Sequence, residues 1–322
     1  MPLFSSRTAK RPRITPALDD AVLARVLRQL SKRGGDSRAV DVAIVSTVLE
    51  QTGADWDRRD HRVSVLAEAT ADTAISSAWV DQEPDSADAL VFHSRVALVR
   101  GLRERQLRDV RQLVQDCRRA SELDPADPLP WVTLLGVARI ERYAQRDVNA
   151  IWREATARDR WHREAYLQMI SYLSPEEGGS SAAVLDFLDV VREHIPANAP
   201  CAAVELTAAV RQYQGLLVQG GVRAMTAGQL WSGGRPAAAL DQAAALWPKP
   251  GFFQHAGALA DLNMLAYALC AAGRAADAHP VFQVLQGTVT AWPWQAEGDP
   301  VQVFEQYRDK AERGRQGRLG TA

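Results

Sequence analysis

Apolar residues recur at every third or fourth position along most of the chain, which is the spacing of an amphipathic α-helix. Pro16 lies just ahead of the first apolar stripe, where proline suits a helix start, and Gly34-Gly35 interrupt it. The pattern predicts a helix over about residues 17–31. Its stripe consists of Leu18, Val22, Leu23, Val26, Leu27 and Leu30.

The same period continues beyond the glycine pair and predicts a long series of helices. The stretch 37–52 is rich in β-branched residues, so a strand is the alternative there, but its length and its lack of sustained alternation favour a helix. No alternating run between turn signals stands out, so β-structure is predicted to be minor. The predicted helices span residues 37–52, 56–71, 72–82, 87–102, 104–123, 129–142, 146–158, 162–173, 180–193, 199–219, 222–232, 235–246, 255–272, 274–288 and 300–313.

Helices of this length joined by short loops are typical of helical hairpins. A single hairpin cannot bury its own apolar face, so such hairpins stack on one another. The predicted fold class is therefore all-α, an α-solenoid of stacked antiparallel helical hairpins.

Three segments resemble tetratricopeptide repeats (TPR). The first segment covers residues 117–136, the second covers residues 263–282 with Gly273 at its turn, and the third covers residues 234–248. The resemblance implies a TPR-like superhelix whose small residues let paired helices approach closely. In the first segment, the end of one repeat is matched by Ala120, Leu123 and Pro125, and the start of the next by Trp131, Leu134 or Leu135, and Gly136.

A second resemblance concerns the middle of the chain. Residues 55–59, 124–135 and 158–175 are similar to a group of actinobacterial helical-repeat proteins without an assigned activity. This likeness implies a helical-repeat fold and carries no expectation about function.

The distribution of the repeat-like segments predicts the domain organisation. We expect a basic flexible arm at residues 1–15, an N-terminal helical region at 16–86, TPR-like repeats at 87–290, and a capping helix with a basic tail at 291–322. Whether residues 1–86 stack on the repeats is left open. Trp292-Pro293-Trp294 is interpreted as a segment that folds back on the array, and an exposed aromatic hook is the alternative.

Composition and charge narrow the function classes. The 322 residues are 47% hydrophobic, which is enough for a substantial core, and the formal net charge is -1. That balance argues against a nucleic-acid binder that uses its whole surface. Residues 1–38, however, carry nine basic and three acidic side chains, so the arm could contact an anionic partner. A solvated basic tail is the alternative.

Two short segments combine tryptophan, arginine, aspartate and histidine: residues 56–62 and 158–164. Arginine guanidinium groups beside an indole could bind carboxylates or phosphates. Alternatively, the same residues could form ion pairs between helices. The candidate partner-binding residues, chosen from these segments and from neighbouring predicted inner helices, are Arg58, Arg59, His61, Arg139, Arg142, Arg163 and Tyr166.

Motifs for other chemistry are missing from the sequence. There is no G-x-S-x-G, no H-E-x-x-H and no phosphate-binding glycine loop, and the six histidines are scattered, so neither a metal nor a cofactor is expected. Cys117, Cys201 and Cys270 are interpreted as buried small apolar residues within helices. The N-terminus has no signal-like apolar stretch and no run of about 18 apolar residues occurs, so we expect a cytoplasmic chain without a membrane span.

These observations predict a non-catalytic interaction scaffold or adaptor. Its concave groove would bind a peptide or a partner protein, since a solenoid exposes a long curved surface. The alternative is a regulatory or sensor protein whose basic N-terminal arm contacts nucleic acid or a DNA-binding partner. A helical enzyme that uses the Arg/His/Asp segments is a third possibility, which would require a deep pocket holding both.

Overall fold

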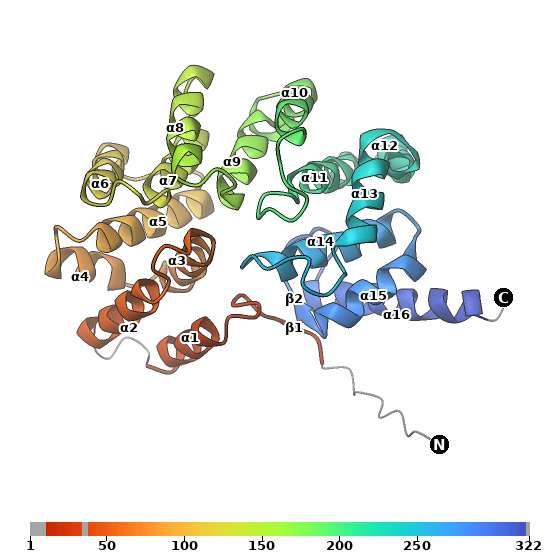
Figure 1. Ribbon diagram of the computed structural model, residues 1–322, viewed down its shortest axis with the longest axis horizontal. Coiled ribbons are helices and arrows are strands. Elements are labelled where there is room, and N and C mark those ends of the chain that lie inside the picture. Colours follow the sequence, from red (N-terminus) through yellow and green to blue (C-terminus); the bar gives the residue numbers. More distant parts are fainter. Residues whose placement is uncertain (1–10, 34–37, 320–322) are drawn as a thin grey trace. The chain divides into compact units, whose positions relative to one another are not determined.

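The computed structural model describes residues 11–33 and 38–319, and it is helical almost throughout (Figure 1). The all-α prediction is confirmed for these residues, which form sixteen α-helices and two strands of two residues each. The packing divides the chain into one compact unit at residues 19–204 and a second that combines residues 1–18 with 205–322. The sequence-based boundaries at residues 86 and 290 stay a prediction.

Ten helices make up the unit at residues 19–204. Their ends follow local chemistry; Ser86, for example, accepts a hydrogen bond from the backbone N–H of Ala89 and so caps its helix. The helices are α1 (Ala21–Arg33), α2 (Arg38–Glu50), α3 (Trp56–Thr70), α4 (Ile75–Gln82), α5 (Ala87–Glu104), α6 (Val110–Leu123), α7 (Leu129–Ile140), α8 (Gln145–Arg158), α9 (Arg163–Leu173) and α10 (Ser181–Arg192), with a 3₁₀ turn η1 (Pro175–Glu177) after α9.

The odd-numbered helices of this unit lie side by side in chain order. Helix α1 packs on α3, α3 on α5, α5 on α7, and α7 on α9. The even-numbered helices α2, α4, α6 and α8 run along the other side of this row (Figure 1). Helices α1, α5, α7 and α9 also contact their hairpin partners α2, α6, α8 and α10, whereas α4 packs on α2 and α5. Consecutive hairpins therefore bury their apolar faces against one another.

The close crossing of α5 and α7 explains one of the repeat-like residues. A Cβ atom at Gly136 of α7 would lie 2.5 Å from Cδ2 of Leu98 on α5. Leu98 is itself buried among Leu113, Leu134 and Val137. A side chain at this position would have to displace Leu98, which is already packed in the core.

The second unit contains α11 to α16. The prediction of a helix over 222–232 is only half right, because α12 ends at Thr226 and the remaining residues form the 3₁₀ helix η2 (Ala227–Ser232). The helices are α11 (Val204–Gln219), α12 (Gly221–Thr226), α13 (Gly234–Leu246), α14 (Ala258–Ala271), α15 (Ala275–Leu285) and α16 (Pro300–Leu319), with a third 3₁₀ turn η3 (Trp294–Ala296).

The predicted helix over 274–288 also ends early. Gln286 and Gly287 have positive φ angles, of 48° and 83°, which stop α15 and turn the chain into the strand β2 (Thr288–Val289). This strand pairs in parallel with β1 (Arg13–Ile14), so Arg13 lies opposite Thr288. The last residues of the predicted basic arm are thus held against the second unit, and residues 1–10 of that arm lie outside the described part.

Trp294 forms the centre of the second unit. Its side chain is fully buried, its indole N–H donates to Oδ1 of Asn263 at 2.8 Å, and its ring packs against Tyr267 and Phe304. The fold-back interpretation of this segment is confirmed for Trp294. Neighbouring Trp292 is half-buried and donates to Gln214 at 3.0 Å.

Within the described residues, no helix has both the length and the apolar character required to cross a membrane.

Candidate functional site

Helix α3 carries the first tryptophan and arginine segment. Asp55 caps the helix by accepting from the backbone N–H of Arg58 at 3.1 Å. The buried face of α3 begins with Arg59 and Arg62 and continues through apolar residues such as Val63 and Leu66. Two arginines thus occupy positions that the helical period assigns to the core, and each needs an acid within reach.

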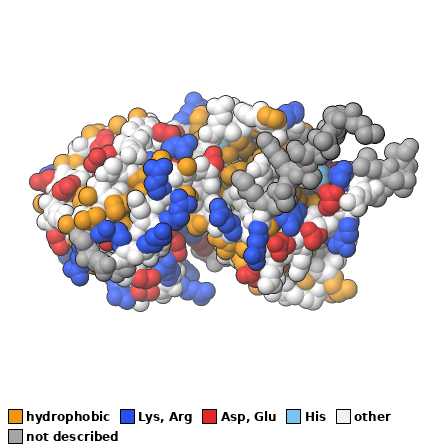
Figure 2. All heavy atoms as spheres, turned by 90° about the horizontal axis from the view of Figure 1, so that it is seen from below, with side chains coloured by type: hydrophobic (Ala, Val, Ile, Leu, Met, Phe, Trp, Pro, Cys, Tyr) orange, Lys and Arg blue, Asp and Glu red, His pale blue; other side chains and the backbone are white. Residues whose placement is uncertain are grey.

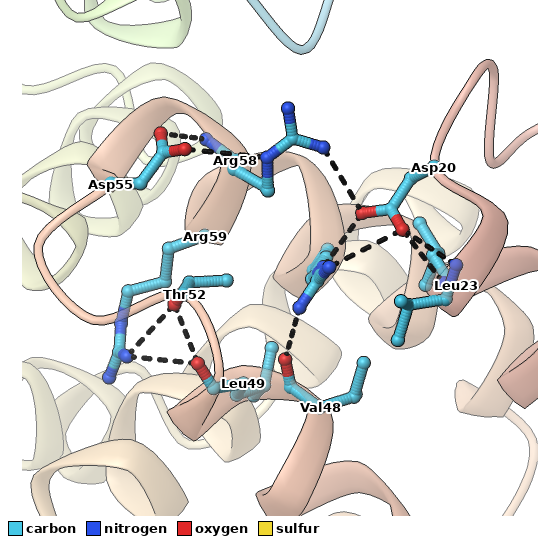
Figure 3. A network of polar contacts seen from close by, with 10 residues as sticks. Asp20, Leu23, Val48, Leu49, Thr52, Asp55, Arg58 and Arg59 are labelled. Atoms are coloured by element: carbon cyan, nitrogen blue, oxygen red, sulfur yellow. Dashed lines mark hydrogen bonds and ion pairs between the residues drawn. The ribbon is translucent and has the colours of Figure 1, made fainter.

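Arg62 meets its acid at the start of α1. Its Nε lies 2.7 Å from Oδ2 of Asp20 and its Nη2 3.3 Å from Oδ1, while Nη1 donates to the carbonyl of Val48 at 2.7 Å. The Asp20 carboxylate also accepts from the backbone N–H of Leu23 at 2.9 Å, as Figure 3 shows. Asp20 thus caps α1, and this cap is also half of a buried ion pair.

Arg59 joins three elements. Its Nη2 pairs with the carboxylate of Asp88 on α5, and its Nε lies 3.7 Å from Oδ2 of Asp127, just before α7. Its Nη1 also faces Oγ1 of Thr52 and the carbonyl of Leu49, at 3.4 and 3.5 Å (Figure 3). Only 6% of Arg59 is exposed, so this candidate binding residue is directed into the protein.

A fourth pair links α3 to α5. Nη2 of Arg95 donates to Oδ1 of Asp60 at 2.7 Å, and both residues are buried. We call the four pairs Asp20–Arg62, Asp60–Arg95, Arg59–Asp88 and Arg59–Asp127, in which every arginine is buried, the Arg–Asp ladder. The ladder crosses the row of helices, because its pairs run from the start of α1 through α3 and α5 to the start of α7.

Arg139 on α7 occupies a similar place further along the row. Its guanidinium pairs with both carboxylate oxygens of Glu177 in η1 and donates to Oε1 of Gln168 on α9. Such a bidentate ion pair restrains a side chain more firmly than a single hydrogen bond does. Arg139 therefore joins α7 to α9.

The other predicted site residues differ in exposure. Tyr166 is 4% exposed, and its hydroxyl donates to the carbonyl of Arg160 at 3.1 Å. Arg142 is exposed directly after α7, with a positive φ of 52°. Arg163 and His61 are half-buried. Arg58 is partly exposed, and its Nε lies 3.3 Å from Oδ2 of Asp55 and its Nη1 3.6 Å from Oδ2 of Asp20. Arg58, Arg59, Arg139 and Tyr166 thus meet acids, an amide or a backbone carbonyl of their own unit.

The second tryptophan segment is also held by internal contacts. The guanidinium of Arg158 lies 5.1 Å from the ring centre of Trp131, and its Nε donates to the carbonyl of Pro125 at 2.9 Å. Arg160 covers the ring of Trp161 at 4.7 Å. Arg158 and Arg160 of this segment therefore make contacts within their own unit, and an inter-helix ion pair in this segment stays a prediction.

Two acids of the ladder, Asp20 and Asp127, have pKa values that are shifted in opposite directions. Burial alone would raise the pKa of Asp20, but the hydrogen bonds from Arg62 and Leu23 hold it below its ordinary value. Burial raises the pKa of Asp127 to about 6, against the opposing effects of the Leu129 N–H and of Arg59. The side chain of Asp127 accepts one hydrogen bond, from the backbone N–H of Leu129 at 2.7 Å. Its second oxygen lies 3.7 Å from Nε of Arg59, which is the distance of an ion pair rather than of a hydrogen bond.

The raised pKa of Asp127 predicts a pH dependence of stability. An acid whose pKa is higher in the folded than in the unfolded state loses stability as it ionises, so its penalty is absent below about pH 4 and complete above about pH 6. The full difference corresponds to about 3 kcal/mol. We therefore expect the free energy of unfolding of the wild type to rise relative to that of Asp127→Asn as the pH falls from 7 to about 4.5.

Urea unfolding of both proteins across this pH range measures the effect. The comparison concerns only the pH slope, since the asparagine amide also changes the contact with Arg59. Parallel curves for the two proteins would contradict the assignment. Asp20 has a lowered pKa, so the stability it contributes is lost only at lower pH, as the pH falls through its folded pKa.

The cysteines take the structural places expected of them, with one exception. Cys117, Cys201 and Cys270 are free thiols and buried, and burial raises the pKa of Cys117 and Cys270 to about 12. Cys201 lies in a turn rather than in a helix, contrary to the prediction. Nδ1 of His93 lies 3.2 Å from Oγ of Ser76. Residues 11–33 and 38–319 contain no group of three His, Cys, Asp or Glu side chains suited to a metal ion.

Arg95, Asp88 and Asp127 are absent from the sequence-based candidates, although they complete the ladder. The signal that identifies such residues is charge at a core position, as in α3, where Arg59 and Arg62 stand three residues apart on the buried face. Their acids lie far away in the sequence, up to 68 residues from Arg59 in the case of Asp127. Only the packing of the helices reveals those partners.

Comparison of the chain with protein-family models, with curated proteins and with solved structures finds no match.

Proposed function

We propose that this protein is a non-catalytic interaction scaffold or adaptor that binds a peptide or a partner protein on the surface of its stacked helical hairpins. The observation that carries the proposal is the row α1, α3, α5, α7 and α9, in which each helix packs on the next. A row of this kind presents a long face built from several helices, and such faces bind extended or helical segments of other proteins.

The contacts of the arginine segments support a role in binding rather than in catalysis. Catalytic groups need to reach a substrate, whereas Arg59, Arg62 and Arg95 are buried against carboxylates of neighbouring helices. These charges therefore serve the packing of the hairpins. The exposed side chains of the helices are then the surface that is available to a partner.

The TPR-like solenoid is part of the same proposal. Gly136 provides the close helix crossing that the repeat resemblance implies, and Ala120 and Ala138 are buried without exposed surface. Small residues in these places are what paired helices of such repeats require. We infer a superhelix from these contacts together with the repeat-like sequence segments.

Affinity purification of the full-length tagged chain from its native cells, followed by mass spectrometry, tests the proposal. We expect at least one protein that co-purifies reproducibly at both low and moderate salt, because apolar contacts between helices withstand screening. Recovery of nucleic acid alone, lost as the salt concentration rises, would instead favour the basic arm as the functional element. Recovery of no partner under any condition would contradict the proposal.

A further inference from the structure

An open apolar groove runs between α1 and α2, the first hairpin of the row. Its volume is about 410 Å³. The floor is apolar and Val40 is 43% exposed, although a valine in a closed core would be covered. The residues that line the groove are Val22, Arg25, Val26, Gln29, Val40, Ala43, Ile44, Thr47, Val48 and Gln51.

The groove carries positive charge that the described residues do not compensate. Arg25 lines it, and no carboxylate does. Lys32 stands seven residues further along α1, on the same face as Arg25, and both side chains are exposed. Arg33, by contrast, is paired with Asp41 at 2.9 Å. Within the described part of the chain, no ion pair involves Arg25 or Lys32, and α1 contains no acid.

We propose that the α1–α2 groove binds an acidic amphipathic helix of a partner protein. The inference rests on the proposed scaffold function and names the partner segment. The apolar floor matches the apolar stripe of such a helix, and carboxylates beside the stripe match Arg25 and Lys32. Figure 2 shows hydrophobic side chains interspersed with basic and acidic ones on the left-hand part of the surface.

The length of the groove sets the size of the bound segment. Its lining on α1 runs from Val22 to Gln29, which is two turns of helix or about 10 Å. A partner helix would place apolar residues at i, i+4 and i+7 on this length. Glutamate or aspartate beside those positions would reach Arg25, and one further turn would reach Lys32.

A displayed peptide library with the purified full-length chain as bait tests this inference. The library consists of helical peptides of about 18 residues with apolar residues at i, i+4, i+7 and i+11, and with Glu, Gln or Lys varied at the flanking positions. We expect enrichment of peptides with Glu at these positions. An enriched peptide should bind the wild type at least about tenfold more tightly than its Glu-to-Lys counterpart.

Charge reversal in the protein provides the decisive comparison. Arg25→Glu changes an exposed side chain, so the fold is retained. We expect the substitution to weaken binding of the Glu peptide by about tenfold and to strengthen binding of the Lys peptide. Arg118→Glu is the matched control, because Arg118 is exposed on α6 of the same unit. Ile44→Asp places a charge on the groove floor and should abolish binding of both peptides, with circular dichroism as the check of folding.

Several outcomes would overturn the groove assignment. They are the absence of enrichment, enrichment without a preference for Glu, and equal binding by wild type and Arg25→Glu. A dimer in sedimentation that is lost in Ile44→Asp would show that a second copy of the chain occupies the groove. If a partner still co-purifies with Arg25→Glu and Ile44→Asp, the scaffold function stands and the groove assignment fails, whereas no partner for the wild type contradicts the scaffold itself.

Discussion

Replacing Arg62 by alanine is expected to lower the free energy of unfolding of the unit at residues 19–204 by about 3–5 kcal/mol. The substitution leaves the Asp20 carboxylate buried, with its side chain 3% exposed, and removes both guanidinium contacts to it. It also removes the donor to the Val48 carbonyl. The carboxylate then keeps only the longer contact to Arg58 at 3.6 Å and the backbone N–H groups of α1, and this loss is costly because water does not replace the missing guanidinium.

Urea unfolding monitored by circular dichroism measures the loss. Arg108→Ala is the matched control, since Arg108 pairs with Glu104 on the surface with 82% of its side chain exposed, and such pairs contribute about 0.5 kcal/mol or less. A double-mutant cycle with Asp20→Asn then isolates the pair from the helix cap that Asp20 also provides. Equal effects of Arg62→Ala and Arg108→Ala would show that the ladder does not hold the helices together.

Replacing Trp294 by alanine should cost the second unit about 3–5 kcal/mol. The indole is fully buried, packs on Tyr267, Phe282 and Phe304, and donates to Asn263. Alanine leaves a cavity between α14, α15 and α16, and Oδ1 of Asn263 keeps only the longer hydrogen bond from the backbone N–H of Thr290 at 3.4 Å. The unfolding transition of residues 205–322 is expected to shift, with loss of near-ultraviolet circular dichroism from the aromatic cluster.

Trp294→Phe separates the two contributions of the indole. It keeps most of the ring volume and removes only the hydrogen bond, so a loss of about 1–2 kcal/mol is expected. If Trp294→Ala were as stable as the wild type, the tryptophan would have no place in the core. The exposed aromatic hook that the sequence left as an alternative would then have to be considered again.

Helix positions could be predicted from the sequence because the apolar period recurs in each element. The errors occur where a local backbone feature ends the period early. At Gln286 and Gly287 the left-handed conformation stops α15 while apolar residues continue into β2. At Ala227 the helix tightens into a 3₁₀ turn, although Leu230 and Trp231 continue the apolar pattern. The spacing of hydrophobic residues does not indicate where the backbone adopts a left-handed or 3₁₀ conformation.

The ladder could be predicted only in part. The arginines of residues 56–62 stand out by composition, but the sequence does not show whether a charged side chain faces water or the core. That decision depends on the distant acids, Asp20, Asp88 and Asp127, which the packing brings within reach of α3. For the same reason Arg59 was a candidate for partner binding, although its guanidinium is buried.

The α1–α2 groove was not among the predicted sites either. Its apolar residues are the same stripe that predicts two ordinary amphipathic helices, and the pattern does not reveal which part of a stripe stays uncovered. Val40 and Ile44 read as core residues of α2, yet they line an open groove. The unpaired charge of Arg25 becomes informative only once that groove is known.

The claim that the groove binds the partner, whereas the arginine segments hold the fold together, is tested most directly by comparing two substitutions in the full-length chain. The measurement is the amount of co-purifying partner retained by Arg25→Glu and by Arg58→Ala, relative to the wild type. We predict that Arg25→Glu loses the partner and that Arg58→Ala, which removes only the partly exposed pairs with Asp55 and Asp20, retains it. Loss with Arg58→Ala and retention with Arg25→Glu would contradict the account and return the site to the arginine segments.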